Sequence, residues 1–155
     1  MLVVNDRGQV WVGERRPKWA KGSPPIWQLP QGGLLPGEPP DAAALRELYE
    51  ETGMRSVEIV GGIADWVTYL LPEDLVGVAL KGKYRGQKIK WFVLHFTGPD
   101  SEIDISARQG RKAEFDRWRW CDYDAFLDRA PEHRRALYET VGRALLPIAS
   151  ATPPR

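Results

Sequence analysis

Three glutamates, Glu47, Glu50 and Glu51, lie close together in the segment "RELYEETG". On an α-helix these positions are i, i+3 and i+4, so the three carboxylates point to the same side. Two carboxylates ~4 Å apart repel by on the order of 4 kcal/mol in a partly shielded site. Hard divalent ions such as Mg²⁺ prefer carboxylate, water and phosphate oxygens. The cluster is therefore either a solvated acidic helix face or a site for Mg²⁺ and a phosphate substrate.

The loop before the glutamates favours the second interpretation. In "QGGLLPGEPP", Gly32 and Gly33 permit the backbone to approach a ligand closely and to adopt dihedral angles that other residues cannot reach. The prolines of the same segment stiffen the loop, and Glu38 can anchor it. A loop with a merely flexible, structureless role would not need both glycines and prolines here.

Strands and one helix must position this loop and cluster. The segment 41–52 is predicted to be a helix, because it has strong helix formers and no internal Gly or Pro, and Gly53 fits a left-handed C-cap. A second helix is predicted over 131–148, from apolar residues at helical spacing. Strands are predicted in "LVV", "QVWVGE", "IWQL", "VEIVGGI", "WVTYLL", "KIKWFVLHF" and "RWRWCDY". This order predicts an α+β domain with a mixed sheet flanked by helices.

Composition restricts the class of protein. The chain has 155 residues, 43% of them apolar and 28% charged, which predicts one domain over residues 1–148 and a flexible tail over 149–155. The net charge of +1 gives no global basic field for nucleic acid, although a local patch would suffice. No stretch is long and apolar enough for a membrane span, and the N-terminus does not read as a signal peptide. The single cysteine, Cys121, fits a reducing cytoplasm, and we expect a monomer.

The loop and helix together resemble the signature of the Nudix family: Gly, five residues, Glu, seven residues, then Arg-Glu-apolar-any-Glu-Glu-any-Gly-apolar. Every fixed position is filled, by Gly32, Glu38, Arg46, Glu47, Leu48, Glu50, Glu51, Gly53 and Met54. A gapped pattern of this length is far more specific than a short phosphate-loop pattern. The resemblance implies the Nudix fold, a mixed β-sheet sandwiched between α-helices, and Mg²⁺-dependent hydrolysis of a nucleoside diphosphate linked to another moiety.

The resemblance also implies a role for each residue of the motif. Glu47, Glu50 and Glu51 would bind the metal, with Mn²⁺ or Zn²⁺ as alternatives to Mg²⁺, and Gly32 would lend its backbone carbonyl. Arg46 and Glu38 would orient the loop and helix, and Gly33 and Gly53 would be structural.

Further segments resemble the branch that contains bacterial RNA pyrophosphohydrolases and asymmetric diadenosine polyphosphate hydrolases. These segments are "WQLPQGG", "DWVTYLLP", "GQKIKWFVLHF" and "EFDRWRW". In that branch the glutamate of the last segment, here Glu114, completes the metal site, although alone it would read as a surface charge. Glu47, Glu51 and Glu114 are then the catalytic candidates, and either Glu51 or Glu114 would deprotonate or orient the attacking water.

Substrate residues are less clearly marked in the sequence. Lys88 and Lys90 alternate along a strand and would steady phosphates from one face, or would be solvated edge lysines. Tyr69 resembles the base-side aromatic of the branch, with ordinary sheet packing as the alternative. Basic and aromatic positions complete the set of candidates, namely Arg15 and Arg16 for RNA phosphates, His133 for stacking on a base and Arg134 for phosphate.

Two departures from the branch accompany the resemblance. The strand that the branch normally carries before the part that begins here at Met1 is missing, so either the true start lies upstream or a short first strand leaves an exposed sheet edge. His133 and Arg134 replace a Phe-Lys pair that often opens the last helix.

Three functions follow in order of preference. The first is an RNA 5′ pyrophosphohydrolase, the second a dinucleoside polyphosphate hydrolase, and the third a nucleotide-binding module without catalysis. The intact glutamates argue against the third.

Overall fold

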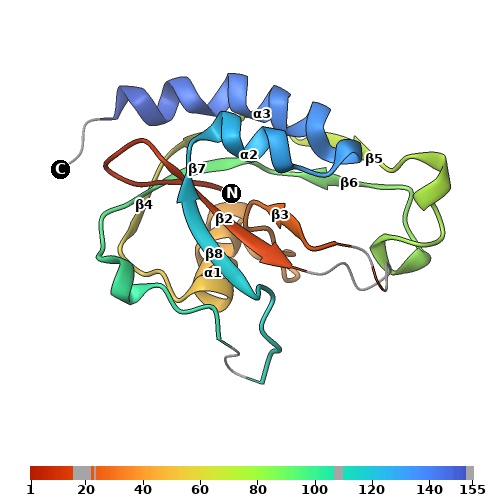
Figure 1. The fold of residues 1–155 in the computed structure, drawn as a ribbon, viewed down its shortest axis with the longest axis horizontal. Helices are drawn as coiled ribbons and strands as arrows, with labels where there is room; N and C mark the ends of the chain where they lie inside the picture. Colours follow the sequence, from red (N-terminus) through yellow and green to blue (C-terminus); the bar gives the residue numbers. More distant parts are fainter. Residues whose placement is uncertain (16–21, 23, 107–109, 153–155) are drawn as a thin grey trace.

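A mixed β-sheet with helices on both faces forms the body of the molecule (Figure 1). The computed structural model describes residues 1–15, 22, 24–106 and 110–152. The strands of the main sheet are β1 (Leu2–Val4), β2 (Val10–Arg15), β3 (Ile26–Gln28), β4 (Val57–Gly62), β7 (Phe92–Phe96) and β8 (Arg117–Cys121). They follow the order β3-β2-β1-β7-β4, with β8 paired to β2. β1 and β7 are parallel and the other pairs are antiparallel, which confirms the prediction of a mixed sheet.

Two further strands form a separate antiparallel ribbon, and three α-helices complete the fold. The ribbon consists of β5 (Val67–Leu70) and β6 (Gly86–Ile89). The α-helices are α1 (Pro40–Thr52), α2 (Tyr123–Arg129) and α3 (Glu132–Ala151), and short 3₁₀ turns occupy Glu73–Leu75, Leu80–Gly82 and Asp100–Glu102. No helix in the described part of the chain is long and apolar enough to cross a membrane.

Successive side chains along the strands point to opposite faces of the sheet and belong to two hydrophobic cores, one on each face. Val10 and Val12 pack in the same cluster as Val141 and Leu145 of α3. Trp11, between them in sequence, points to the other face and packs in the cluster that contains Leu48 of α1. This period-two alternation is what a sheet buried on both faces requires, and it confirms the helix–sheet–helix layering.

Helix α1 carries the glutamate cluster and packs it partly into the protein. Its buried residues are Ala43, Ala44, Glu47, Leu48 and Thr52. Gly53 ends the helix at φ 73°, and its N–H donates to the carbonyl of Tyr49 over 2.8 Å. The predicted helix and its left-handed cap are confirmed, and a carboxylate lies on the face that the sequence would assign to apolar side chains.

The structure differs from the predicted elements in three places. The expected strand over 88–96 is interrupted at residues 90–91, so its two halves belong to different sheets, β6 and β7. Helix α2 follows β8 directly and was not predicted; its seven residues are too few to show a clear helical period. Helix α3 continues to Ala151, so the first part of the expected tail over 149–155 is helical.

The short first strand does not leave an exposed edge at β1. β1 lies between β2 and β7, and Leu2 and Val3 are fully buried. The ends of the main path of the sheet are β3 and β4 instead.

Candidate active site

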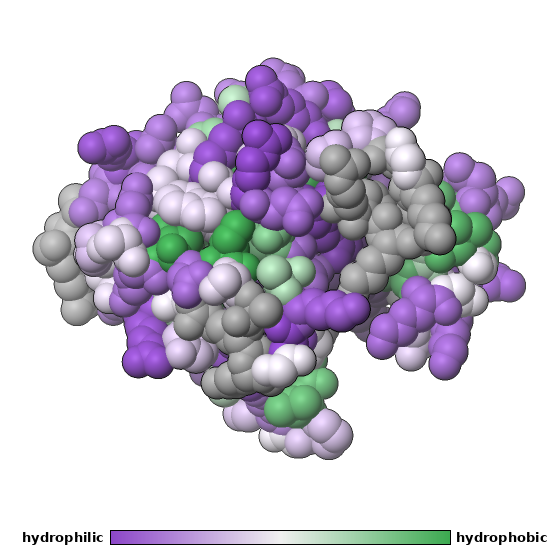
Figure 2. Space-filling view, turned by 60° about the horizontal axis from the view of Figure 1, so that its bottom comes forward, coloured by the Kyte–Doolittle hydropathy of each residue, from purple (hydrophilic) through white to green (hydrophobic). Residues whose placement is uncertain are grey.

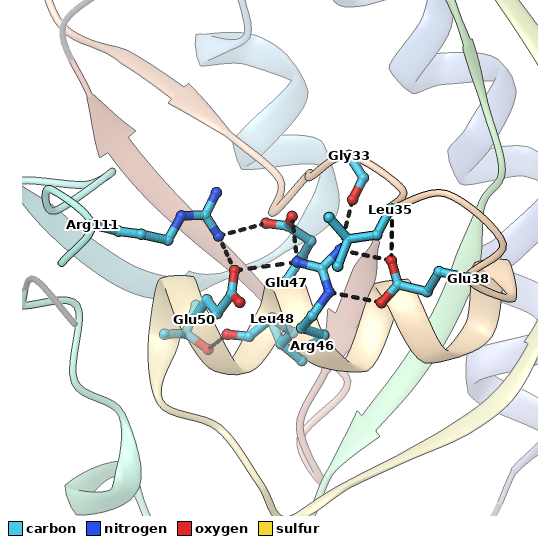
Figure 3. Close-up of polar contacts among 9 residues, drawn as sticks. Gly33, Leu35, Glu38, Arg46, Glu47, Leu48, Glu50 and Arg111 are labelled. Carbon is cyan, nitrogen blue, oxygen red and sulfur yellow. Dashed lines mark hydrogen bonds and ion pairs between the residues drawn. The ribbon is translucent and has the colours of Figure 1, made fainter. Parts of the chain in front are cut away.

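The guanidinium group of Arg46 fastens the glycine-rich loop to helix α1 (Figure 3). Its Nε and Nη2 donate to the two carboxylate oxygens of Glu38 over 2.7 and 2.8 Å, and Nη2 also donates to the carbonyl of Gly33 over 2.8 Å. Nη1 reaches the helix, where it donates to Glu47 over 2.8 Å and to Glu50 over 3.3 Å. One planar donor set therefore fixes the loop relative to the glutamate cluster.

Glu38 is held in its charged form by this arrangement. The hydrogen bonds from Arg46 and, next, from the backbone N–H of Leu35 lower the pKa of Glu38 to about 2. The anchoring role that the sequence suggested for Glu38 matches this geometry.

Gly32 and Glu47 are in direct contact. A Cβ at position 32 would lie 2.2 Å from Cδ of Glu47, so any larger residue would displace the carboxylate. Glu47 is 5% exposed, and its Oε1 accepts from Arg46. The first glycine of the loop is thus required for a close approach rather than for an unusual dihedral angle.

Glu51 is the most unfavourably placed carboxylate in the cluster. Its Oε2 is buried and has no hydrogen-bond partner among the described residues. Burial, and then the nearby charges of Glu114 and Glu47, raise the pKa of Glu51 to about 8. A buried oxygen of this kind needs either a proton or a cation, because an uncompensated buried charge is costly.

Glu114 reaches the cluster from the distant loop before β8. The next residue, Phe115, packs against β2, where a Cβ on Gly13 would lie 2.3 Å from its ring. Phe115 also meets Trp11 edge-on, with ring centroids 5.2 Å apart. This packing places Glu114 beside Arg15, with which it forms an ion pair.

A small cavity of about 30 Å³ joins the two glutamate-bearing segments. Its lining includes Glu50, Glu51, Glu114 and Arg111. A cavity needs only about 10–15 Å³ of such volume to hold one water. The space among these carboxylates therefore matches a water or a small ion.

Two arginines outside the motif neutralise part of the cluster. Arg111 forms ion pairs with Glu50 and, over 3.3 Å, with Glu47 (Figure 3), and Arg15 pairs with Glu114. Across residues 1–15, 22, 24–106 and 110–152, no three acidic, histidine or cysteine side chains converge in a geometry ready for a metal. A metal at these carboxylates would require their arginine contacts to rearrange.

The residues nevertheless fit a hard divalent cation. Oε2 of Glu51 has no hydrogen-bond partner within the described residues, Glu47 lies against Gly32, and Glu50, Glu51 and Glu114 line the small cavity. Oxygen donors of this type suit Mg²⁺ or Mn²⁺.

A larger cavity of about 350 Å³ lies beside the cluster. It is lined by Glu47 and Gly32 and also by Lys88 and Lys90. Lys88 is exposed, whereas the Nζ of Lys90 donates to the carbonyls of Ile63, over 2.9 Å, and Ala64. Lys88 is thus the more available of the two cations.

The remaining substrate candidates gather near the start of α3. The guanidinium of Arg134 lies 4.9 Å from the ring centroid of Tyr69 and donates to Gln31 over 3.2 Å and Gln87 over 3.3 Å. Tyr69 is 6% exposed, which is the packed arrangement, and its hydroxyl donates to the carbonyl of His133 over 3.1 Å.

Two predicted residues are not placed at the large cavity, and three residues of the site were not predicted from the sequence. His133 is half-buried and is not among the residues that line the 350 Å³ cavity, and Arg16 lies outside the described residues. Gln31, Gln87 and Arg111 were not predicted. Only their positions beside recognised motifs could have indicated them, because their contacts join segments far apart in the chain.

The buried carboxylate of Glu51 generates a stability prediction for the metal-free protein. The pKa of Glu51 is about 8 in the folded protein, against an ordinary value of 4.5. Below pH 4.5 the carboxyl group is protonated in both the folded and the unfolded state and does not destabilise the fold. Its destabilising effect grows as the pH rises from 4.5 to about 8, because over this range mainly the unfolded state ionises. In excess chelator, Glu51→Gln should therefore melt several degrees above the parent at about pH 8 and much closer to it at about pH 5. Differential scanning calorimetry measures both. Equal melting temperatures at both pH values would contradict the burial of an uncompensated charge at Glu51.

Comparisons with known proteins agree with this geometry. The family model described as NUDIX domain matches residues 1–141. The RNA pyrophosphohydrolase of Agrobacterium fabrum is 45% identical over 145 residues, which are 91% of this chain and 85% of that protein. The RNA pyrophosphohydrolase of Rhodopseudomonas palustris strain HaA2 is 44% identical over 156 residues, covering 97% of this chain and 91% of that protein.

Solved structures match the fold. A Caenorhabditis elegans Ap4A hydrolase binary complex superposes with a TM-score of 0.58 at 19% identity, covering 93% of this chain and 94% of that one. The Escherichia coli dihydroneopterin triphosphate pyrophosphohydrolase gives 0.61 at 22% identity, covering 90% of each chain. The signature residues, the layered mixed sheet and these matches lead to one conclusion: the chain belongs to the Nudix family.

Proposed function

We propose that this protein is a divalent-cation-dependent RNA 5′ pyrophosphohydrolase, which releases pyrophosphate from 5′-triphosphorylated RNA. The observation that carries the proposal is the meeting of Glu47, Glu50 and Glu51 on α1 with Glu114 from a distant loop, beside a cavity that contains lysines. Relatives that are 44–45% identical over most of the chain are RNA pyrophosphohydrolases by name.

The same four glutamates would hold the divalent ions, with the Gly32 carbonyl as a further oxygen ligand. We favour Mg²⁺, and Mn²⁺ and Zn²⁺ are the alternatives to test. When bound, such ions spread the charge of the polyphosphate and lower the pKa of a bound water. Glu51 and Glu114 both line the small cavity, so either carboxylate can accept a proton from a water there.

Cationic side chains would position the phosphates and the adjoining nucleotide. Lys88 offers an exposed ammonium group in the same cavity as Glu47. Arg134 lies on α3 and Arg15 on β2, and both would bind further phosphate oxygens. We propose the same role for Arg16, which lies outside the described residues. Burial, and then the charge of Arg134, lower the pKa of His133, so its ring is neutral at pH 7 and suited to stacking on a base.

A dinucleoside polyphosphate hydrolase is the second candidate. The net charge of +1 favours a small substrate over a long polyanion, and both substrates present a phosphoanhydride to the same carboxylates. A module without catalysis is disfavoured, because the four glutamates are intact and Oε2 of Glu51 is buried with no hydrogen-bond partner among the described residues.

Turnover on two substrates tests the proposal. With Mg²⁺ in excess, we expect kcat/KM for a 5′-triphosphorylated RNA to exceed that for diadenosine tetraphosphate by about tenfold or more, and chelator to abolish both activities. Glu51→Gln should lower kcat by about a hundredfold or more, because it removes a charge that acts where charge develops in the transition state. The matched control is Glu139→Gln, an exposed carboxylate of α3 that should retain the parent rate.

A higher kcat/KM for the dinucleotide would replace the first candidate by the second. Full activity in chelator, or normal turnover of Glu51→Gln, would reject the assignment of these glutamates.

Arg111 should compete with the divalent cation in the free protein. It pairs with two carboxylates of the proposed metal site, so binding of the ion must displace it. Because partly exposed ion pairs contribute up to about 1 kcal/mol, Arg111→Ala should tighten the Mn²⁺ dissociation constant by roughly twofold to fivefold. Calorimetric titration without substrate measures this, and Arg143→Ala, the same change at an exposed site on α3, should have no effect. Unchanged Mn²⁺ affinity in Arg111→Ala would show that the arginine does not occupy the metal carboxylates.

His133 provides a test of the substrate end of the site. If its ring stacks on a base, His133→Ala should raise KM for RNA by roughly tenfold with little change in kcat, because the contact is equally present in ground and transition states. His133→Phe should retain or improve KM. Steady-state kinetics on one short triphosphorylated RNA measures both, and an unchanged KM for the alanine variant would remove His133 from the substrate site.

A further inference from the structure

The β5–β6 ribbon has one buried and one exposed face. In the antiparallel register Tyr69 pairs with Gln87 and Thr68 pairs with Lys88. Paired residues point to the same face. Tyr69 is buried and Gln87 is half-buried, whereas Thr68 and Lys88 are both exposed. The face that carries Lys88 therefore looks away from the main core.

Two aromatic rings extend this exposed face at opposite ends of the ribbon. Trp66 comes just before β5 and Tyr84 comes two residues before β6. Both side chains line the 350 Å³ cavity that Lys88 also lines. They are 46% and 58% exposed, which makes them the two most exposed aromatic side chains in the part of the chain that the structure describes. The face of the molecule in Figure 2 is largely hydrophilic, with apolar residues in separate small groups.

The exposed face leads to the hydrolytic centre. Trp66, Tyr84 and Lys88 line the same 350 Å³ cavity as Glu47 and Gly32. Lys88 makes no hydrogen bond or ion pair with any described residue. A chain of substrate that leaves the carboxylates along this cavity would meet an uncommitted cation and then an aromatic ring.

The segment that leads into β6 and runs along it is basic. The segment "KGKYRGQKIK", residues 81–90, carries five basic residues and no acidic residue, while the whole chain has a net charge of only +1. Lys81, Lys83 and Arg85 are exposed in addition to Lys88. A basic segment next to exposed aromatic rings is typical of surfaces that bind single-stranded nucleic acid.

We propose that the exposed face of the β5–β6 ribbon binds the RNA strand that follows the 5′ triphosphate. Trp66 and Tyr84 each stack on a nucleobase, and Lys88 contacts a phosphate between them. The inference rests on the proposed function and deepens it by assigning a binding surface to the body of the RNA.

The length of the ribbon favours an RNA strand over a second nucleoside. Pairing extends beyond β6, where the N–H of Leu71 donates to the carbonyl of Arg85 over 2.8 Å. A strand rises about 3.3 Å per residue, so the ribbon from Trp66 to Leu71 spans roughly 17 Å. Rings at the two ends of such a ribbon contact different nucleotides of one strand and do not enclose a single base.

Kinetics on RNAs of increasing length tests this surface. The substrates are a triphosphorylated dinucleotide, tetranucleotide and octanucleotide of one sequence, with the full chain and Mg²⁺. For Trp66→Ala and Tyr84→Ala we expect KM for the octanucleotide to rise about tenfold, KM for the dinucleotide to change less than about twofold, and kcat to stay constant. Trp66→Phe and Tyr84→Phe keep an aromatic face and should restore KM.

A binding measurement separates this proposal from the proposed function. Fluorescence anisotropy in chelator reports the affinity of the octanucleotide without turnover, and Lys88→Ala should weaken it and reduce its salt dependence, whereas Arg143→Ala on α3 should not. If the parent hydrolyses triphosphorylated RNA but both alanine variants show the parent KM at every length, the ribbon surface is rejected and the function stands. If the parent neither hydrolyses nor binds RNA and cleaves diadenosine tetraphosphate, the proposed function fails and the ribbon proposal fails with it.

Discussion

Repulsion among carboxylates is the constraint on which the rest of this structure depends. Glu47, Glu50 and Glu51 share one side of α1, and Glu47 is almost completely buried. Such a cluster would drive the helix away from the core unless cations compensated it. The protein supplies guanidinium groups from three separate segments. Arg46 lies on the helix, Arg111 on the loop before β8 and Arg15 on β2, and all three pair with carboxylates in or beside the cluster.

These cations differ in what they bind. Arg46 has its donors committed to the loop and helix at once, so it is a permanent part of the framework. Arg111 is about half exposed, and its ion pairs within the described part of the chain are with Glu47 and Glu50, so this contact can be exchanged for another cation. Among the residues that the structure describes, Oε2 of Glu51 has no hydrogen-bond partner, and burial together with the charges of Glu114 and Glu47 raises the pKa of this carboxyl group. Arg46 thus holds the loop and helix in place, while the carboxylates paired with Arg111 remain able to bind a divalent ion.

The motif and its local structure could be predicted because their determinants are close in sequence. The helix over 41–52, its Gly53 cap and the tie between Glu38 and Arg46 all arise from residues within a few turns of one another. The layered sheet also followed from the alternation of apolar residues and from the family signature. The break between β6 and β7 could not be read in the same way, because "KIKWFVLHF" is uniformly strand-like and only tertiary packing separates its halves. Arg111 was missed for a related reason, since its partners lie about sixty residues away.

The separation of the β5–β6 ribbon from the main sheet has an evolutionary consequence. The ribbon shares no backbone ladder with the strands that support α1 and Glu114. Insertions, deletions or exchanges in residues 66–90 can therefore alter its outer face without shifting the register of the catalytic scaffold. A family that retains one hydrolytic centre can therefore change its substrate through such a ribbon. Selection for substrate binding acts on the ribbon, whereas selection for catalysis acts on the main sheet.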